Sequence, residues 1–446
     1  MVAPWPVVVA AATPFGNAAL AVVRLDGQPL DAVLDRVATR LRPGPWRAGR
    51  ARRVSFADDG GTYDDGVVIV RRGPRSYTGN DHAEIGLHGN PLLVARLVDA
   101  CLAAGARAAG PGELTRRAVV NGRMDLLAAE GVDQLVRATS MEGLRIARAG
   151  LSGALGVRVR NVRETLLAAA AELEARLDWP DDDLALTGDD EVLAAVRNAG
   201  LTCGGLAATF EAGRALVDGV RVAIVGPVNA GKSSLFNAVL GRTRALVDPR
   251  PGTTRDVVEA RCVLGPLTVT LLDTAGERPA ADPVEAAGLA LARGFVEEAD
   301  LLLVVVRASP DAPDAAERDV LARTADRRRL VVYNGIDRPS VAPPGEGWWP
   351  TSALTGEGIP ALIAAITSFA GGAAGEGLLV ASARQRDRLL AVQAACEEAL
   401  VAFVEAGVAV AADAVVRGIE ELDTLTGADT REDVLDAVFA RFCIGK

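Results

Sequence analysis

The stretch that decides the fold runs from Val220 to Leu240 and reads VRVAIVGPVNAGKSSLFNAVL. Its first six residues form an apolar run typical of a buried strand, and LFNAVL begins an apolar helix. The residues between them match G-x-x-x-x-G-K-S, the pattern of phosphate-binding loops, in the required order of strand, loop and helix. Backbone N–H groups and the helix N-terminus both favour bound phosphate. We expect these residues to contact nucleotide phosphates: Asn229, Ala230, Gly231, Lys232, Ser233 and Ser234.

Further polar groups of a phosphate site follow along the chain. The segment Pro251-Gly-Thr-Thr-Arg-Asp256 resembles a GTPase switch segment, in which threonine groups approach Mg²⁺ and the γ-phosphate. We expect Thr253 and Thr254 to contact the nucleotide, and Ser233 and Thr254 to ligate Mg²⁺. A later strand ends in an aspartate typical of the metal site and a glycine whose N–H senses the γ-phosphate. The contacts expected there are Asp273, Thr274, Ala275 and Gly276.

Two loops nearer the C-terminus predict which base the bound nucleotide carries. Asn334 and Asp337 follow a strand at the spacing of the Asn-Lys-x-Asp motif of GTPases. The Asp337 carboxylate would accept hydrogen bonds from the ring N–H and exocyclic amine of guanine, and another base would leave it unpaired. Ser352 and Ala353 match the loop that lies behind the guanine. Because Gly335 replaces the motif's lysine, we expect guanine selection to persist with weaker nucleotide affinity.

The first part of the chain has a different pattern from the nucleotide-binding segment. Apolar runs at 5–12, 18–25 and 65–71 predict short strands, and Pro91 to Gly105 predicts a helix begun by proline and ended by glycine. These elements predict a mixed α+β domain over residues 1–120.

Helical periodicity dominates two separate blocks, 121–218 and 373–446. In the first block Leu166, Ala170 and Leu173 recur along one helix face. Strands and helices alternate between the blocks, over residues 219–372. The simplest architecture is a helical domain interrupted by an inserted α/β domain with a Ras-like P-loop fold, preceded by the α+β domain.

Composition bounds the class of protein. The net charge of -10 argues against a protein that coats nucleic acid along its whole surface. Residues 1–123 nevertheless hold 16 Arg against 11 Asp and Glu, a net of +5. Their arginine run either meets a phosphate backbone or is a solvated loop, and on its own it favours the loop. The run consists of Arg40, Arg42, Arg47, Arg50, Arg52 and Arg53.

The cysteines and apolar runs indicate the compartment. Five scattered cysteines form no C-x-x-C pair, so neither a zinc knuckle nor a disulfide framework is expected. The sequence has no evident secretory signal and no apolar run of membrane-spanning length. We therefore expect a cytoplasmic protein that does not enter the membrane.

Motifs outside the nucleotide-binding segment resemble the tRNA-modifying GTPase family MnmE, also called TrmE. The resemblance runs from about residue 7 to the last residue and ends in a Cys-Ile-Gly-Lys tetrapeptide. The segments that carry it are Ala11–Gly16, Ala21–Gly27, Ser76–Ile85, His88–Pro91, Pro111–Ala118, Asn121–Leu126 and Phe442–Lys446.

The resemblance implies a folate-binding N-terminal domain that also dimerises, a helical domain, and a G domain inserted into it. It implies that GTP hydrolysis, together with an FAD-containing partner of the MnmG type, serves to add an aminomethyl or carboxymethylaminomethyl group to carbon 5 of the wobble uridine of certain tRNAs. A homodimer that joins the flavoprotein in a heterotetramer is implied, with a 5-formyl or methylene tetrahydrofolate derivative as one-carbon donor. The family's folate contacts fall on Arg24, Glu84, Arg123 and Lys446.

For hydrolysis, the resemblance implies that K⁺ takes the place of an arginine finger. The side-chain ligand falls on Asn229, and backbone carbonyls of the following loop, with Asp248, Arg250 and Thr253, supply the rest. The two prolines and Arg250 of that loop depart from the family. The family's water-positioning glutamate falls on Glu285, with Glu277 and Asp282 as nearby alternatives.

The C-terminal tetrapeptide carries a further candidate reactive group, the thiol of Cys443. Cys443 is either a small buried hydrophobe that caps the helical domain or, as the resemblance implies, a thiol that takes part in modification.

A regulatory or ribosome-assembly GTPase, which catalyses hydrolysis alone, is the alternative function. Such proteins usually append a basic RNA-binding module, whereas residues 378–446 hold 7 basic and 12 acidic side chains. This acidic block and the terminal tetrapeptide favour the modifying enzyme.

Overall fold

A computed structural model describes residues 5–58, 60–178, 187–242, 244–246, 257–274, 294–337, 346–369, 377–428 and 432–445. Their contacts divide the chain into two compact units. The first consists of Met1–Asp133, Gly150–Ala199 and Ala394–Lys446, and the second of Gln134–Ala149 and Gly200–Gln393. Among the described helices, none has the length and apolar character needed to cross a membrane.

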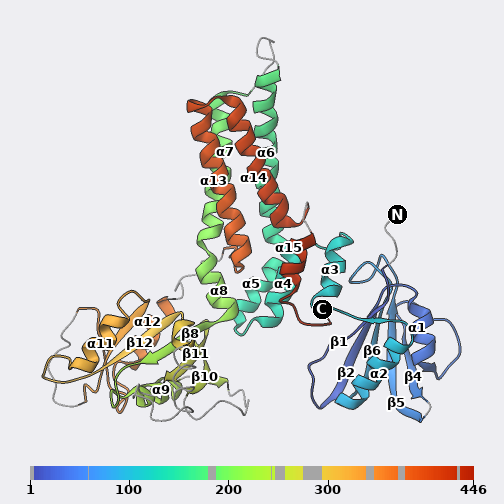
Figure 1. Ribbon diagram of the computed structural model, residues 1–446, viewed down its shortest axis with the longest axis horizontal. Coiled ribbons are helices and arrows are strands. Elements are labelled where there is room, and N and C mark those ends of the chain that lie inside the picture. The colour runs from blue at the N-terminus through green and yellow to red at the C-terminus, as the bar shows by residue number, and fades with distance from the viewer. Residues whose placement is uncertain are drawn as a thin grey trace. The chain divides into compact units, whose positions relative to one another are not determined.

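The first unit contains a seven-stranded sheet of order β3-β4-β5-β6-β2-β1-β7 (Figure 1). Neighbouring strands are antiparallel except β1 and β7, which are parallel. The strands are β1 (Val8–Ala11), β2 (Ala18–Asp26), β3 (Thr39–Arg40), β4 (Ala51–Asp58), β5 (Gly61–Arg71), β6 (His82–Gly89) and β7 (Arg107–Ala108). The strands predicted from the apolar runs are confirmed as β1, β2 and the end of β5.

Helices cover the two faces of this sheet unequally. α1 (Leu30–Val37) and α2 (Pro91–Ala103) pack on one face, where Val23, Val68 and Ile85 belong to the core. The predicted start of α2 is confirmed, because Asn90 caps it by accepting a hydrogen bond from the Leu92 N–H at 2.8 Å. On the other face α3 (Glu113–Val120) packs over β1 through Leu114. Strands β2, β5 and β6 therefore present polar side chains on a face that α1 and α2 leave uncovered.

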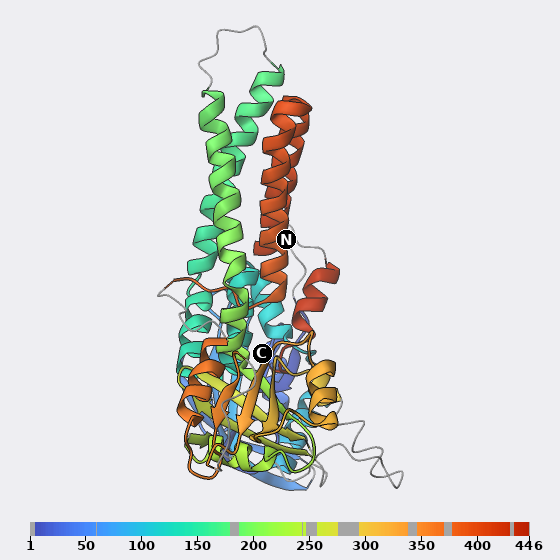
Figure 2. The same ribbon diagram turned by 90° about the vertical axis from the view of Figure 1, so that its left-hand side faces the viewer.

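Helices precede and follow the second sheet along the chain. Helices α6 and α14 pack against each other, although the whole second sheet lies between them in the sequence (Figures 1 and 2). Leu166 and Leu173 of α6 are buried, as their spacing predicts. The helices before the sheet are α4 (Leu126–Arg137), α5 (Met141–Leu151), α6 (Ala154–Asp178), α7 (Asp189–Ala208) and α8 (Phe210–Asp218). Those after it are α13 (Ala383–Glu405), α14 (Val408–Thr426) and α15 (Glu432–Phe439).

The second unit is built on a sheet of order β14-β13-β12-β8-β11-β10-β9. β8, β11, β12, β13 and β14 are parallel, while β10 is antiparallel to β11 and to β9. The strands are β8 (Val220–Val225), β9 (Arg244–Leu246), β10 (Val257–Leu264), β11 (Leu267–Thr274), β12 (Leu301–Arg307), β13 (Arg329–Asn334) and β14 (Trp349–Thr351).

Helices lie on both faces of this second sheet. α9 (Lys232–Leu240) and α12 (Ile359–Phe369) bury apolar side chains such as Leu235 and Leu362 on one face. α11 (Ala315–Arg323) packs Val320 on the other. This layering matches the predicted α/β fold, in which ligands bind at the carboxyl ends of parallel strands.

Candidate functional site

The predicted phosphate loop joins the carboxyl end of β8 to the first residue of α9. Lys232 is buried, and its Nζ donates hydrogen bonds to the carbonyl oxygens of Gly226 and Pro227, each at 2.9 Å. Ser233 is exposed in the first turn of α9, and the Asn229 side chain is exposed in the loop. The loop therefore gathers an ammonium group, a hydroxyl and a helix N-terminus at one end of the sheet, where they suit phosphate oxygens.

Asp273 lies beside this loop at the end of β11, opposite Ile224 of β8. The residue is buried, and its Oδ1 has no hydrogen-bond partner among the described residues. A buried carboxylate oxygen without a partner is unfavourable, whereas a hard cation or its bound water would satisfy it. The carboxylate and the Ser233 hydroxyl therefore fit Mg²⁺.

The predicted base-recognition residues are brought together after β13 and β14. The Asn334 side chain is buried, accepts from the Ala353 N–H at 3.1 Å and donates to the Ala230 carbonyl at 3.4 Å. The Ser352 hydroxyl donates to Asp337 Oδ1 at 2.6 Å, and Asp337 is exposed. Its Oδ2 has no partner among the described residues, which leaves an acceptor for a base. The Asn334 amide thus ties the base loops to the phosphate loop.

Gly335 has a backbone conformation that restricts its replacement. Its φ is +103°, a value that residues with a Cβ rarely adopt. A Cβ there would have space, since its nearest neighbour is the Ala308 Cβ at 3.9 Å. The backbone conformation rather than crowding therefore favours glycine at this position.

Several predicted residues lie outside the described residues, so the structure leaves their roles as predictions. They are Asp248, Arg250, Thr253, Thr254, Ala275, Gly276, Glu277, Asp282, Glu285 and Lys446.

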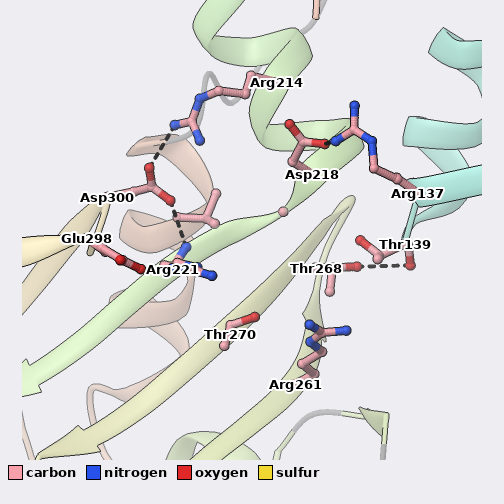
Figure 3. A pocket seen from close by; sticks show the side chains of 12 residues that line it. Arg137, Thr139, Arg214, Asp218, Arg221, Arg261, Thr268, Thr270, Glu298 and Asp300 are labelled. Atoms are coloured by element: carbon pink, nitrogen blue, oxygen red, sulfur yellow. Dashed lines mark hydrogen bonds and ion pairs between the residues drawn. The ribbon is translucent and has the colours of Figure 1, made fainter. Parts of the chain in front are cut away.

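A charged cavity of about 610 Å³ lies at the opposite, amino end of the second sheet, along the first residues of β8 and β11 (Figure 3). Most of its charged groups pair with one another: Arg214 lies 2.8 Å from Asp300, and Arg137 pairs with Asp218 of α8. The Thr268 hydroxyl also donates to the Thr139 carbonyl at 3.0 Å. These contacts fasten α8 and the end of α4 to the sheet, and the nucleotide residues lie at the other end of the strands.

A second site in the first unit brings both ends of the chain together. On the uncovered face of the first sheet, Arg24 of β2 stands opposite Glu84 of β6. The Arg24 Nε and Nη2 donate to Glu84 Oε1 at 3.1 and 3.0 Å, and Nη1 donates to the Gly445 carbonyl at 3.0 Å. Arg24 and Glu84, two of the predicted folate residues, are therefore in contact with each other. They lie beside Gly445, which directly precedes Lys446, a third predicted folate residue.

The C-terminal tail is held in place by its backbone. Ile444 forms an antiparallel bridge with Pro111, and the Gly112 N–H donates to the Cys443 carbonyl at 3.3 Å. Phe442 anchors the tail in an apolar cluster with Leu126 and Phe439. The tail therefore lies along the loop before α3.

The Cys443 side chain is exposed. The other four cysteines are buried. Burial raises the pKa of the Cys101 thiol to about 12. Burial is also the largest cause that raises the pKa of the Cys396 thiol to about 11. The interpretation of Cys443 as a buried hydrophobe is thus wrong, because the backbone bonds leave its side chain facing solvent. Its accessibility suits a reacting thiol.

The fourth predicted folate residue, Arg123, is exposed and packs its aliphatic stem near Gly79. Its guanidinium has no ion pair or hydrogen bond with the described residues. Asn121 holds the same loop by donating to the Thr78 carbonyl at 2.7 Å. The arginine is therefore free to meet an anionic group.

A buried ionic network below this loop was not predicted. Asp26 and Arg117 are fully buried and lie 2.9 Å apart, and Thr78, Asn80 and His82 also bond to Asp26. Burial acts to raise the pKa of Asp26, but the bonds from His82, Thr78, Asn80 and Arg117 outweigh it and hold that pKa below 3.8. The only signal in the sequence is a polar Thr-Gly-Asn turn, because the partners are 52 to 91 residues apart.

The donor set of this second site fits a folate. Glu84 Oε2 has no partner among the described residues and can accept from the amino-pyrimidine part of a pterin. The free Arg123 guanidinium matches the carboxylates of a glutamate tail. No described residue of the site opposes these two roles.

Comparison with family models gives matches over nearly the whole chain. Residues 7–123 match the model described as the GTP-binding protein TrmE N-terminus. Residues 126–443 match the MnmE helical domain.

Curated relatives and solved structures were also compared. The chain is 38% identical over 462 residues to the tRNA modification GTPase MnmE of Roseiflexus sp. (strain RS-1). The aligned region covers 98% of this chain and 99% of that protein. The chain is 39% identical to the protein of the same name from Halorhodospira halophila, covering 98% and 95%. Among solved structures it is similar to the G domain of the T. maritima FeoB iron transporter, with 26% identity, 34% and 98% coverage and a TM-score of 0.28.

Proposed function

The chain belongs to the tRNA modification GTPase MnmE family, and we propose that it hydrolyses GTP to drive a chemical modification of tRNA. The observation that carries the GTPase part is the Asn334 amide, which bonds both to the base loop at Ala353 and to the phosphate loop at Ala230. Base and phosphate recognition are thereby joined in one site.

The residues around the nucleotide have distinct roles in this proposal. Lys232 exchanges its two carbonyl contacts for the β and γ phosphates, which attract an ammonium group more strongly than neutral carbonyls do. Asp337 accepts from guanine with its unpaired Oδ2, while Ser352 fixes its orientation through Oδ1. Ser233 and Asp273 would hold Mg²⁺ directly or through water, and the bound ion would neutralise charge on the phosphates.

Hydrolysis has two further proposed participants. The exposed Asn229 side chain would ligate K⁺, together with backbone carbonyls of the loop that holds Asp248, Arg250 and Thr253, and Glu285 would position the attacking water. The expected result of replacing K⁺ by Na⁺ is slower hydrolysis at saturating GTP. Equal rates with the two ions would remove K⁺ from the proposal.

The modification is proposed to occur at the tail site, at carbon 5 of the wobble uridine. Arg24, Glu84, Arg123 and Lys446 would bind a 5-formyl or methylene tetrahydrofolate, which supplies the one-carbon unit when bound. The exposed Cys443 thiolate would attack either the carrier's carbon, with the C–N bond to the carrier breaking and its nitrogen keeping the electron pair, or uridine C6. In the second case one S–C bond forms and C5 becomes nucleophilic. Loss of the C5 proton and expulsion of the thiolate then restore the ring after C5 has been substituted.

The remaining proposals concern assembly and place. We propose that the chain forms a homodimer through its N-terminal domain and a heterotetramer with an FAD protein of the MnmG type. The exposed apolar side chains Phe15, Leu20 and Leu92 support an interface on that domain. We place domain boundaries near residues 120, 218 and 372, with a folate-binding first domain and the G domain inserted into the helical one. Four cysteines are buried as thiols rather than joined in disulfides, which supports action in the reducing cytoplasm.

The test is mass analysis of wobble uridines in tRNA from a strain that lacks this chain. The expected result is loss of the C5-substituted nucleosides, restored by the wild-type chain but not by Lys232→Ala. Unchanged nucleosides in the deletion strain would instead support the alternative, a regulatory or ribosome-assembly GTPase without modification chemistry.

A further inference from the structure

Six arginines of the first unit are exposed to solvent. Their guanidinium groups form no ion pair or hydrogen bond with the described residues. They belong to the loop before β4, to β4 itself, to the last residue of β5 and to the segment that follows β5. This arginine surface consists of Arg42, Arg47, Arg50, Arg53, Arg71 and Arg75.

Backbone contacts hold these arginines together. Ala48 forms a bridge with Val70, and the Gly49 N–H donates to the Val70 carbonyl at 2.8 Å. Arg47 and Arg50 therefore flank a bridge that lies one residue from Arg71. The Arg72 guanidinium fastens the same loop by donating to the Trp46 carbonyl at 3.1 Å.

Most of the neighbouring carboxylates are already paired with other side chains. Arg72 binds both Asp31 and Asp81, each at 2.8 Å. Asp35 pairs with Arg40, and Asp58 pairs with Arg96. Apart from the exposed Asp65, which lies on the same face two residues from the position opposite Arg53, these carboxylates leave most of the positive charge of the arginine surface uncompensated, which the sequence alone did not reveal.

The arginine surface adjoins the tail site on the same sheet face. Strand register places Arg71 opposite His82 and Ile69 opposite Glu84, which in turn stands opposite Arg24. Because side chains alternate between the faces of a strand, Arg71 shares the face of Glu84 and Arg24. Arg53, opposite Val67, lies on this face as well.

We propose that the arginine surface binds the phosphate backbone of the tRNA and directs the anticodon to the tail site. The proposal rests on the proposed function, which supplies tRNA as the substrate. Guanidinium groups pair with phosphates through two parallel hydrogen bonds, and several together give salt-dependent binding without base specificity. The adjoining tail site then receives one nucleotide of the bound strand.

The test compares two triple variants of the full chain with the same change in charge. Arg47→Gln, Arg50→Gln and Arg71→Gln alter the surface, and the control alters Arg148, Arg158 and Arg197, exposed helical arginines without a partner among the described residues. Fluorescence anisotropy measures binding of an unmodified tRNA transcript with a wobble uridine. The first variant should bind about tenfold more weakly at about 0.1 M salt and lose about 2 to 3 units of salt-dependence slope. GTP hydrolysis by each variant checks folding.

Binding and slope equal to those of the control would overturn the proposal, as would a wild-type chain that does not bind tRNA. Wobble-uridine analysis in the deletion strain separates this failure from failure of the function itself. If modification is lost in the deletion strain but the surface variant binds tRNA as tightly as the control, only the proposal for the arginine surface is refuted. Modification that persists in that strain refutes the function on which the surface depends.

Discussion

Gly445→Ala tests the docked tail without changing any reactive group. Gly445 has φ +92°, and a Cβ there would lie 2.5 Å from the Ala11 carbonyl oxygen. Cys443 and Lys446 keep their own side chains in this variant. Loss of activity would therefore report on the position of the tail rather than on its chemistry.

The magnitude follows from these contacts. Carbon and oxygen normally approach to about 3.3 Å, so the tail must shift by about 0.8 Å. The 3.0 Å bond from Arg24 to the Gly445 carbonyl would then be stretched beyond useful length, at a cost of about 1.5–3 kcal/mol. The left-handed backbone adds about 1–2 kcal/mol. Together they lower the ratio of docked to undocked tail about a hundredfold or more.

The assay is wobble-uridine modification in a complemented deletion strain, with GTP hydrolysis of the purified chain in parallel. The control is Gly407→Ala, because Gly407 has a similar φ of +96° and no atom lies within 4 Å of the position that a Cβ would take there. We expect Gly445→Ala to lose modification and keep hydrolysis, and Gly407→Ala to keep both. Normal modification by Gly445→Ala would refute the argument that the docked tail is required.

Three further predictions address the nucleotide, the thiol and the buried network. Asp337→Asn should weaken GTP binding about tenfold or more and favour xanthosine triphosphate in competition assays, because the hydrogen-bond pattern inverts; unchanged GTP affinity would contradict this. Cys443→Ser should abolish wobble modification while GTP hydrolysis persists, and full modification would exclude the thiol. Asp26→Asn should destabilise the first unit by about 1.5–3 kcal/mol in urea unfolding at pH 7, since it removes one charged partner of the buried Arg117, which keeps its pairing with Glu113. The folded-state pKa of Asp26 is lowered, so its contribution is present above pH 3.8 and is lost as pH falls through the folded pKa, and the difference from wild type should shrink there. The exposed Asp58→Asn should change stability little at either pH.

The nucleotide site could be predicted because its parts are local in sequence. The loop from Gly226 to Ser234 needs only the strand before it and the helix after it, and the structure has both. Asn334 and Asp337 likewise lie at the end of one strand. What the sequence did not indicate is the bond from Asn334 to Ala230, because that contact depends on β13 and β8 ending at the same edge of the sheet.

The tail site could be predicted only by resemblance, since its contacts span the whole chain. Arg24 and Gly445 are 421 residues apart, and no periodicity relates them. Glu84 faces Arg24 because β6 pairs with β2 as well as with β5, the strand that precedes it in sequence. The arginine surface has the same origin: the arginines are visible in the sequence, but the pairing of the neighbouring carboxylates with Arg72 and Arg40 is not.

The two candidate sites draw on separate residues, which decides how their activities can be distinguished. The nucleotide site uses residues between Gly226 and Ala353, all in the second unit, whereas Arg24, Glu84 and Cys443 belong to the first. No described residue contributes to both sites. A substitution that stops modification while hydrolysis continues therefore implicates the tail site or the arginine surface, and tRNA affinity separates these two. A substitution that stops both implicates the nucleotide site, since modification is proposed to depend on hydrolysis.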